Sequence, residues 1–411
     1  MAKLIPDDKT STLSLELATS LSDIPATEWD AVAGVDYPFL RHKFLHGLET
    51  TGCTTAEAGW QPCHALLRRD GKLVALMPMY LKSHSYGEYV FDWSWADTWQ
   101  RCGLQYYPRL VSCIPFTPAT GPRLCVVHTE SLEHICKVMA DGIKDWLAKR
   151  ELSSWHCLFP EKPLCDLLAA QDCHVRQATQ FHWFNQGYRS FEEFLATFAS
   201  RKRKNLKRER QRVADQGISL HTLVGGDITK AHWQQFYQFY QMTYAKRSGH
   251  GGYLSREFFM HTTPAMGDQV VLVMAKQAGQ WVAGALYFRS ADTLYGRYWG
   301  CLEELDCLHF EACYYQGIEF CIANGIARFD PGAQGEHKIQ RGFQPVKTYS
   351  NHWIAQPELH AAVGDFTKRE RNHSDAYLEQ ASALLPFKSD QSPFSHNDKG
   401  DLKDNKTEGG L

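Results

Sequence analysis

The sequence predicts an α/β (α+β) protein in which two related halves each combine a mixed β-sheet with flanking helices. Three observations lead to this fold class. First, residues 63–95 and residues 270–300 each contain three predicted strands separated by tight turns. Second, a helical stretch and one further strand follow in both halves. Third, 411 residues are more than one ordinary hydrophobic core requires.

The two strand regions share a pattern. The first consists of CHALLRR, KLVALMPMYLK and YGEYVFDWSW, and the second of VVLVMAKQ, WVAGALYFRS and TLYGRYWG. When their first turns are aligned, Gly71 falls on Gly279, Val74 on Val282 and Ala75 on Ala283. Because few other residues are identical, we interpret the two halves as an internal duplication by pattern.

Helical stretches follow the predicted strands. Residues 131–150 precede the strand SSWHCLF, and residues 308–325 precede the strand IARFD. Between the halves, residues 190–218 predict one helix, which Ser190 and Glu193 begin as a capping box and Gly217 ends. Further helices are predicted over residues 228–247 and after Pro357.

These elements suggest a domain organisation. Residues 1–35 would form an N-terminal strand and helix that lead into a first domain over 36–180. A second domain would follow over 181–357 and include a basic helix at 199–216. The C-terminal helix would occupy 358–387, and the polar residues 388–411 would be disordered.

Composition excludes several classes of protein. A net charge of −2 argues against a chain that coats nucleic acid over its whole surface, so any basic function must be local. The thirteen cysteines are odd in number and include no Cys-x-x-Cys pair, so we expect buried thiols in a reducing compartment and no metal site. With no signal peptide and no run of 18 apolar residues, we expect a cytoplasmic protein without a transmembrane segment. The sequence makes no prediction of oligomeric state.

One predicted helix is strongly basic. It carries Arg201, Lys202, Arg203, Lys204, Lys207, Arg208, Arg210 and Arg212, and only Glu209 opposes them. So many like charges on one helix are unfavourable unless an anion compensates them. Either the cations form a solvated or internally paired face, or Arg201, Arg203, Lys204 and Lys207 bind the phosphates of coenzyme A, a nucleotide sugar or a tRNA backbone.

A second candidate site lies at the start of the helix predicted near Leu308. His309 and Glu311 occupy its first turn, where the helix dipole favours a carboxylate. A histidine and a glutamate just beyond a strand are well placed to act as a general base. Alternatively, His309 packs or caps the helix and Glu311 accepts hydrogen bonds from free backbone donors.

The third candidate is the segment DPGAQGEHKIQRGF, residues 330–343. Gly332 and Gly335 would let the backbone turn sharply and approach a ligand. Their spacing fits neither the dinucleotide-binding motif nor the Walker loop. The cluster of Glu336, His337, Lys338 and Arg341 therefore indicates either a catalytic site or a charged turn.

Taken together, several segments resemble the FemAB-like, peptidoglycan-biosynthesis-related branch of the GNAT acyltransferase superfamily. The resemblance extends from about Asp36 to Trp353 and is carried by YPFLRHKFLHGLE, LKSHSYGEYVFDWSWAD, PFTPATGPRL, SRKRKNLKRER, LYGRYWGC, HFEACYYQGIEF and DPGAQGEHKIQRGFQP. It implies two tandem GNAT-like domains of the Fem type. It also implies acyl or aminoacyl transfer to an amine of a small molecule or a cell-envelope precursor.

The chain departs from related enzymes in two places. Fem-type transferases carry a lysine–aromatic motif after the last core strand, and its nearest equivalent here runs from Lys338 to Phe343 with a different spacing. GNAT enzymes that use acetyl-CoA have a glycine-containing pyrophosphate loop, whereas this chain has the acidic GCLEELDCLHFE. We therefore expect no tightly bound cofactor. The co-substrate is either acyl-CoA with its phosphates bound elsewhere or aminoacyl-tRNA.

The leading hypothesis is an N-acyltransferase. Glu336 or His337 would be the general base, with His309 and Glu311 as alternates. Substrates would be bound by Lys338, Arg341, Arg297, Tyr298, Trp299 and Gln334, and Tyr298 or backbone N–H groups would stabilise the oxyanion. The alternative hypothesis is a non-catalytic RNA- or envelope-precursor-binding protein, which needs the cations but no base.

Overall fold

The computed structural model describes residues 3–5, 12–249, 251–333 and 335–388. Among these residues, the strands are β1 (Lys3–Ile5), β2 (Leu13–Ala18), β3 (Trp60–Pro62), β4 (His64–Arg69), β5 (Lys72–Met77), β6 (Met79–Lys82), β7 (Arg109–Ser112), β8 (Cys125–Val126), β9 (Ser154–Leu158), β10 (His174–Phe184), β11 (Ile218–Val224), β12 (Val270–Gln277), β13 (Gln280–Arg289), β14 (Thr293–Cys301), β15 (Arg328–Asp330) and β16 (Gln344–Ile354). They form one sheet in the order β1-β2-β4-β5-β8 and a longer one in the order β11-β12-β13-β14-β15-β10-β16-β9-β7-β6-β3.

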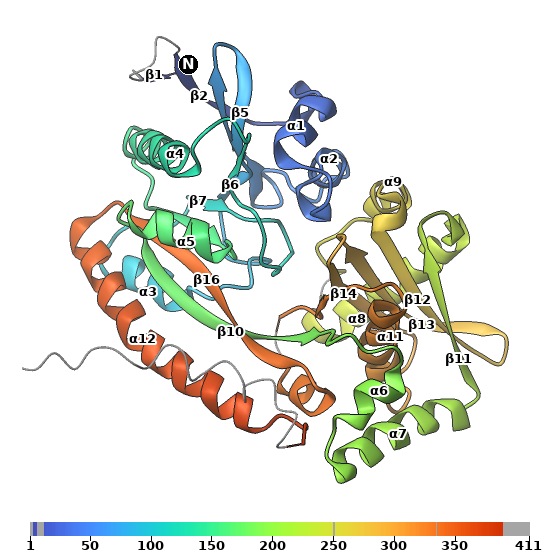
Figure 1. Ribbon diagram of the computed structural model, residues 1–411. Coiled ribbons are helices and arrows are strands. Elements are labelled where there is room, and N and C mark those ends of the chain that lie inside the picture. Colours follow the sequence, from blue (N-terminus) through green and yellow to red (C-terminus); the bar gives the residue numbers. More distant parts are fainter. Residues whose placement is uncertain (1–2, 6–11, 250, 334, 389–411) are drawn as a thin grey trace, which may run out of the picture.

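Helices cover these sheets (Figure 1). In the described ranges, they are α1 (Ala26–Ala33), α2 (His42–Thr50), α3 (Trp93–Arg101), α4 (Leu132–Ala148), α5 (Lys162–Ala169), α6 (Phe191–Ala196), α7 (Ser200–Asp215), α8 (Lys230–Ser248), α9 (Thr263–Ala265), α10 (Leu308–Phe310), α11 (Gln316–Ala323) and α12 (Pro357–Ala383). A π-helical turn over Glu311–Tyr315 joins α10 to α11. The expected mixed sheets flanked by helices are confirmed.

The internal duplication is visible in the two hairpins that the sequence aligned. Asp70 and Gly71 have φ of 49° and 82°, and Ala278 and Gly279 have φ of 48° and 82°. Positive φ at both central positions is the geometry of a type I′ turn. The register then shifts at equivalent places, between Leu67 and Arg68 in β4 and between Ala275 and Lys276 in β12. The two halves therefore share a turn and a bulge, although few of their residues are identical.

Each half also contains a parallel strand pair joined through a helix. In the first half β7 and β9 are parallel, and α4 lies between them in the chain. In the second half β14 and β15 are parallel, and α10 and α11 lie between them. A parallel pair needs such a crossover, because its strands cannot be joined by a short turn.

The two halves are joined by a long antiparallel strand pair, which we call the seam. β10 pairs with β16 from His174–His352 to His182–Gln344. At one end β16 continues the sheet of the first half through β9, and at the other β10 meets β15 of the second half. Figure 1 shows both strands running from one half to the other. Each half thus completes its sheet with a strand that lies far away in sequence.

Two elements differ from the sequence prediction. The segment YGEYVFDWSW was expected to be a strand, but residues 83–92 have no regular structure and α3 starts at Trp93. The single helix expected over 190–218 is two helices, α6 and α7. Between them, Phe198 forms an isolated β-bridge with Phe387, and Ala199 N–H donates to Pro386 O at 2.9 Å. Tertiary contacts override the local helical pattern there.

Several remaining expectations can be located in the structure. The tail predicted to be disordered falls almost wholly on 389–411, outside the described residues. Of the thirteen free cysteines, ten are buried. Across the described ranges, no helix combines the length and the apolar content that a membrane crossing requires.

Buried histidines on the seam and on the adjoining strand β9 have pKa values that make stability depend on pH. Burial lowers the pKa of His182 from 6.5 to about 4, and burial also holds the pKa values of His156 and His352 well below the usual range. The ring nitrogens of His156 and His352 share a hydrogen bond of 2.7 Å. Below pH 6.5 the unfolded chain therefore binds protons that the folded chain does not.

We expect the free energy of unfolding to fall as the pH drops from about 6.5 towards 4. His182 alone should account for up to about 3 kcal/mol of this fall, at about 1.4 kcal/mol per pKa unit. Urea denaturation at pH 7.5 and pH 4 measures the difference. The variant His182→Gln should show a smaller difference, and an unchanged one would contradict the assignment.

Candidate active site

The main cavity opens where β14 and β15 separate. The two strands pair only from Thr293–Arg328 to Tyr295–Asp330. Beyond this point β14 continues to Cys301, whereas the chain leaves β15 at Pro331. A cavity of about 620 Å³, here called the splay cavity, lies in the gap. Its lining residues include Tyr89, Tyr244, Tyr253, Arg297, Tyr298, Trp299, His309, Tyr314, Ala333, Gly335, His337 and Lys338.

A bulge in β14 shapes one wall of this cavity. Opposite β13, Leu286 pairs with Tyr298 and Tyr287 pairs with Gly296, so Arg297 is the extra residue. A bulge breaks the alternation of side chains, and consecutive residues from Gly296 to Trp299 all line the cavity. The Arg297 guanidinium donates to the backbone oxygen of Phe116, which lies in the first half. Both halves therefore contribute to the site.

Lys338 lies at the buried side of the cavity and is 2% exposed. Its Nζ donates to Gly332 O at 2.7 Å, and Gly332 N–H donates to Asp330 Oδ1 at 2.9 Å. Burial lowers the pKa of Lys338 to about 8, although the carboxylate of Asp330 opposes this. The short turn after β15 is thus held at Gly332 on both sides, and it carries an amine that titrates near physiological pH.

His337 and His309 line the same cavity. His337 Nε2 shares a hydrogen bond of 2.8 Å with Tyr314 OH, and the ring of His309 lies 6.2 Å from that of His337. Partial burial, together with the charges of Arg341 and Lys338, lowers the pKa of His337 to about 4. His337 is therefore neutral at neutral pH, which suits it for hydrogen bonding more than for holding a proton.

Glu336 points to a different cavity. It is the neighbour of His337, but in a 3₁₀ turn successive residues lie on different sides. The Glu336 carboxylate accepts a hydrogen bond of 2.8 Å from Tyr377 OH of α12. With Arg176, Gln177, Thr179, Gln180, Thr348, Ser350, Glu370, Tyr377 and others, it lines a cavity of about 390 Å³, here called the seam cavity.

The two cavities adjoin each other. Tyr89, Ala333 and Gly335 line both of them. Arg176 on the seam is fixed by Glu370 of α12, with contacts of 2.6 Å and 2.7 Å. A ligand in the splay cavity and another in the seam cavity would therefore meet across the turn that carries Glu336 and His337.

Two of the described residues expected to act in catalysis or substrate binding lie outside both cavities. Glu311 is buried and bound by Arg210 at 2.9 Å and 3.1 Å. Arg341 is buried, bonds Glu209 at 2.8 Å and 3.0 Å, and also contacts Tyr315 OH at 3.1 Å. These contacts, rather than a ligand, satisfy both charges. In this structure they link α7 to the turn after β15 and to the helices before it.

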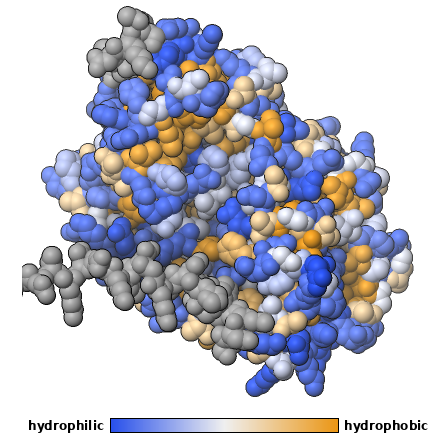
Figure 2. Space-filling model, viewed as in Figure 1, coloured by the Kyte–Doolittle hydropathy of each residue, from blue (hydrophilic) through white to orange (hydrophobic). Residues whose placement is uncertain are grey.

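The basic helix α7 has two different sides. Arg210, Arg212 and Glu209 pair with residues of the second half, which agrees with the internally paired face considered above. At 3.6 residues per turn, the opposite side carries Arg201, Arg203, Lys204, Lys207 and Arg208. Among the described residues, none of these five has an ion pair, and none lines the splay or seam cavity. Figure 2 shows a largely hydrophilic surface in this region.

The sequence did not predict some residues of the site, and one residue that it did predict lies outside the described ranges. Tyr89, Tyr244, Tyr253 and Tyr314 line the splay cavity, each from a separate segment. Tyr89 and Tyr314 lie in segments that carry the family resemblance, but nothing in the sequence singles out these tyrosines. Only their contacts in the folded chain identify them. Gln334 lies outside the described residues.

Comparison with known families and structures gives one strong match. The model of the FemAB-like family, described as peptidoglycan biosynthesis/recognition, matches residues 20–389. No curated protein sequence matches the chain.

Several solved structures are similar at low identity. A tandem GNAT protein from the clavulanic acid biosynthesis pathway is 11% identical over 84% of this chain and 99% of its own, with a TM-score of 0.44. FemX is 11% identical over 78% and 93%, with a TM-score of 0.48. L-PGS from Bacillus licheniformis is 11% identical over 78% and 94%, with a TM-score of 0.48. These similarities are too low to assign a reaction.

We expect Arg341→Ala to destabilise the fold by about 3 kcal/mol, because it leaves Glu209 partly buried without its partner. Urea denaturation measures the loss, and Glu209→Gln in the same background should recover part of it. Arg189→Ala is the control. Arg189 lies just before α6 and forms an exposed ion pair with Glu193 on that helix. If Arg341→Ala lowered the free energy of unfolding no more than Arg189→Ala does, Arg341 would not stabilise the turn.

Proposed function

The chain belongs to the FemAB-like family of peptidoglycan biosynthesis and recognition, and from that premise we propose that it transfers an acyl or aminoacyl group from an activated donor to an amine. One observation carries the proposal: two adjoining cavities meet at a turn that places Lys338 and His337 in one and Glu336 in the other. Such an arrangement suits two substrates that must react with each other.

In the proposed reaction, the acceptor amine loses a proton and its nitrogen attacks the carbonyl carbon of the donor. A C–N bond forms, and the C–O bond of an ester or the C–S bond of a thioester breaks. The leaving oxygen or sulfur takes up a proton, and one proton from the incoming ammonium is released. The site must therefore supply a base for the amine and positive charge for the carbonyl oxygen.

We assign the base to Glu336 and the positive charge to Lys338. Glu336 lines the seam cavity, so a carboxylate would meet an incoming ammonium there. Lys338 lines the splay cavity and is buried, where its charge acts in a medium of low dielectric constant. His337 and Tyr298 would orient the donor by hydrogen bonds, and Arg297 would hold a polar part of it.

We propose aminoacyl-tRNA as the donor, on the evidence of α7. Its outer face carries five cations that form no ion pair within the part of the chain that the structure describes, and they line neither the splay cavity nor the seam cavity. A long polyanion such as tRNA can bind to this face through its phosphates while its aminoacylated end enters a cavity. Acyl-CoA carries only three phosphates, all in the nucleotide part of the molecule, so it would neutralise only part of this face.

The donor can be identified directly. We expect alanyl-tRNA, used as a probe, to transfer its labelled amino acid to a nucleotide-linked muropeptide precursor with a free lysine amine. Acetyl-CoA with the same acceptor is the alternative donor. Transfer from acetyl-CoA alone would overturn the tRNA proposal, and transfer from neither donor, with binding of RNA or precursor retained, would favour the non-catalytic alternative.

We expect kcat to fall as the pH rises through about 8, because Lys338 loses its proton there. Lys338→Met should lower kcat by roughly 100-fold or more and remove this descending limb. The pH dependence of the transfer rate measures both effects. A limb near pH 8 that persists in Lys338→Met would exclude Lys338 as the titrating group.

We expect the triple variant Arg201→Gln, Lys204→Gln, Lys207→Gln to bind tRNA more weakly. The slope of log K against log salt should also decrease by roughly one unit per lost contact. The matched control is Lys137→Gln, Lys149→Gln, Lys162→Gln, which removes three exposed lysines of the first half. Equal salt slopes in the two triple variants would remove α7 from the donor site.

A further inference from the structure

One irregular segment of the first half, residues 83–92, reaches the candidate site and is here called the clamped loop. It connects β6 to α3 and contributes to three cavities. Tyr89 lines both the splay and the seam cavity, and Phe91 lines the seam cavity. Tyr86 lines a third cavity of about 560 Å³, with Trp60, Phe116 and Tyr253 among its other walls.

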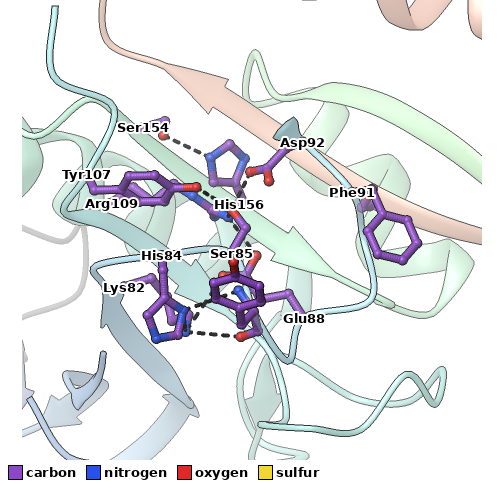
Figure 3. Close-up of polar contacts among 12 residues, drawn as sticks. Lys82, His84, Ser85, Glu88, Phe91, Asp92, Tyr107, Arg109, Ser154 and His156 are labelled. Atoms are coloured by element: carbon purple, nitrogen blue, oxygen red, sulfur yellow. Dashed lines mark hydrogen bonds and ion pairs between the residues drawn. The ribbon is translucent and has the colours of Figure 1, made fainter. Parts of the chain in front are cut away.

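A single buried arginine holds this loop. Arg109 on β7 is 1% exposed, and its Nη2 lies 2.9 Å from Ser85 Oγ, 2.6 Å from Glu88 Oε2 and 2.7 Å from Asp92 Oδ2. Figure 3 shows these three loop residues converging on the guanidinium while Phe91 points away from it. The loop is thus fixed at three points, and the residues between them carry the aromatic rings.

Two tyrosines before β7 and a histidine of β9 support the same contacts. Tyr106 OH donates to Asp92 Oδ2 at 2.6 Å and lies 3.4 Å from His156 Nε2 of β9. Tyr107 OH shares a hydrogen bond of 2.7 Å with Ser85 Oγ. Two carboxylates face one arginine in this cluster, and Lys82 Nζ lies 4.0 Å from Glu88 Oε1 as a second cation when protonated. Burial lowers the pKa of Lys82 to about 7.

Tyr89 is held in a strained conformation. Its φ is 63°, which lies in the left-handed region that side chains with a Cβ disfavour. Glu88, the preceding residue, is 4% exposed and fixed by Arg109. A non-glycine residue keeps such a conformation where its surroundings determine it, and this often occurs at functional sites. The fixed Glu88 sets the direction in which the Tyr89 ring leaves the loop.

From this geometry we propose that Arg109 is a positioning residue for the transfer reaction, and that Tyr89 is the side chain it positions, at the junction where acceptor and donor meet. The inference rests on the proposed function of the two cavities. It adds a role for the first half that neither the basic helix nor the turn after β15 supplies.

The test compares three variants in the full chain. Arg109→Lys keeps the charge but is one bond shorter, so its Nζ cannot take the position of Nη2, which makes all three contacts. Tyr89→Ala removes the ring. Arg123→Lys is the matched control, because Arg123 is also fully buried in the first half but bonds the backbone oxygens of Leu158, Pro122 and Ala119 instead of the loop. If Arg109→Lys does not fold, Ser85→Ala removes one of the three contacts without changing a buried charge.

The first readout needs no substrate. Arg109→Lys should speed amide hydrogen exchange across residues 83–92 by about tenfold or more, and Arg123→Lys should not. The second readout uses alanyl-tRNA and the muropeptide precursor. In Arg109→Lys and Tyr89→Ala, the acceptor KM should rise about tenfold or more and donor hydrolysis should increase relative to transfer.

Each result has a distinct meaning. If the amide hydrogen exchange rate of residues 83–92 were the same in Arg109→Lys as in the wild type, Arg109 would not hold the loop. Faster exchange with unchanged acceptor KM and an unchanged ratio of hydrolysis to transfer would overturn the positioning role. If the wild-type protein transferred nothing from either donor, the proposed function would fail and the positioning role with it, whereas the exchange result would still decide whether Arg109 holds the loop.

Discussion

The pairing of β10 with β16 is the constraint on which the rest of the structure depends. It joins strands of both halves into the longer of the two sheets and fixes the distance between the first half and the turn after β15. Because β16 follows this turn directly, the seam also holds the turn in place. The seam cavity is lined by both strands and by the clamped loop, and it adjoins the splay cavity.

Much of the fold could be predicted because local patterns decide it. Turns such as Asp70–Gly71 and Ala278–Gly279 depend on a few residues, and the following strands alternate regularly. The predicted strand at residues 86–95, which overlaps the clamped loop, is wrong; from Tyr89 to Trp95 an aromatic residue occupies every second position, which is the pattern of a strand. The shape of the loop depends instead on Arg109, which lies outside the segment, so no local pattern could reveal it.

The candidate site could be predicted only in part. Residues 336–338 were expected to act as one cluster, and the sequence could not show that a 3₁₀ turn divides them between two cavities. Arg341 has the same charge as Lys338 and lies only three residues further, yet it bonds Glu209 of α7. Which cation stays available for a ligand depends on where acidic residues from distant segments come to lie.

The exchange of strands at the seam also bears on how the chain folds. The edge of β9 is covered by β16, whose residues are synthesised long after the first half. Until then, a nascent first half would expose the unpaired N–H and C=O groups of β9, and such an edge can pair with another chain. Neither half is therefore expected to be an autonomous folding unit. A fragment that ends before the second half should aggregate rather than fold, even though it contains most of its own core.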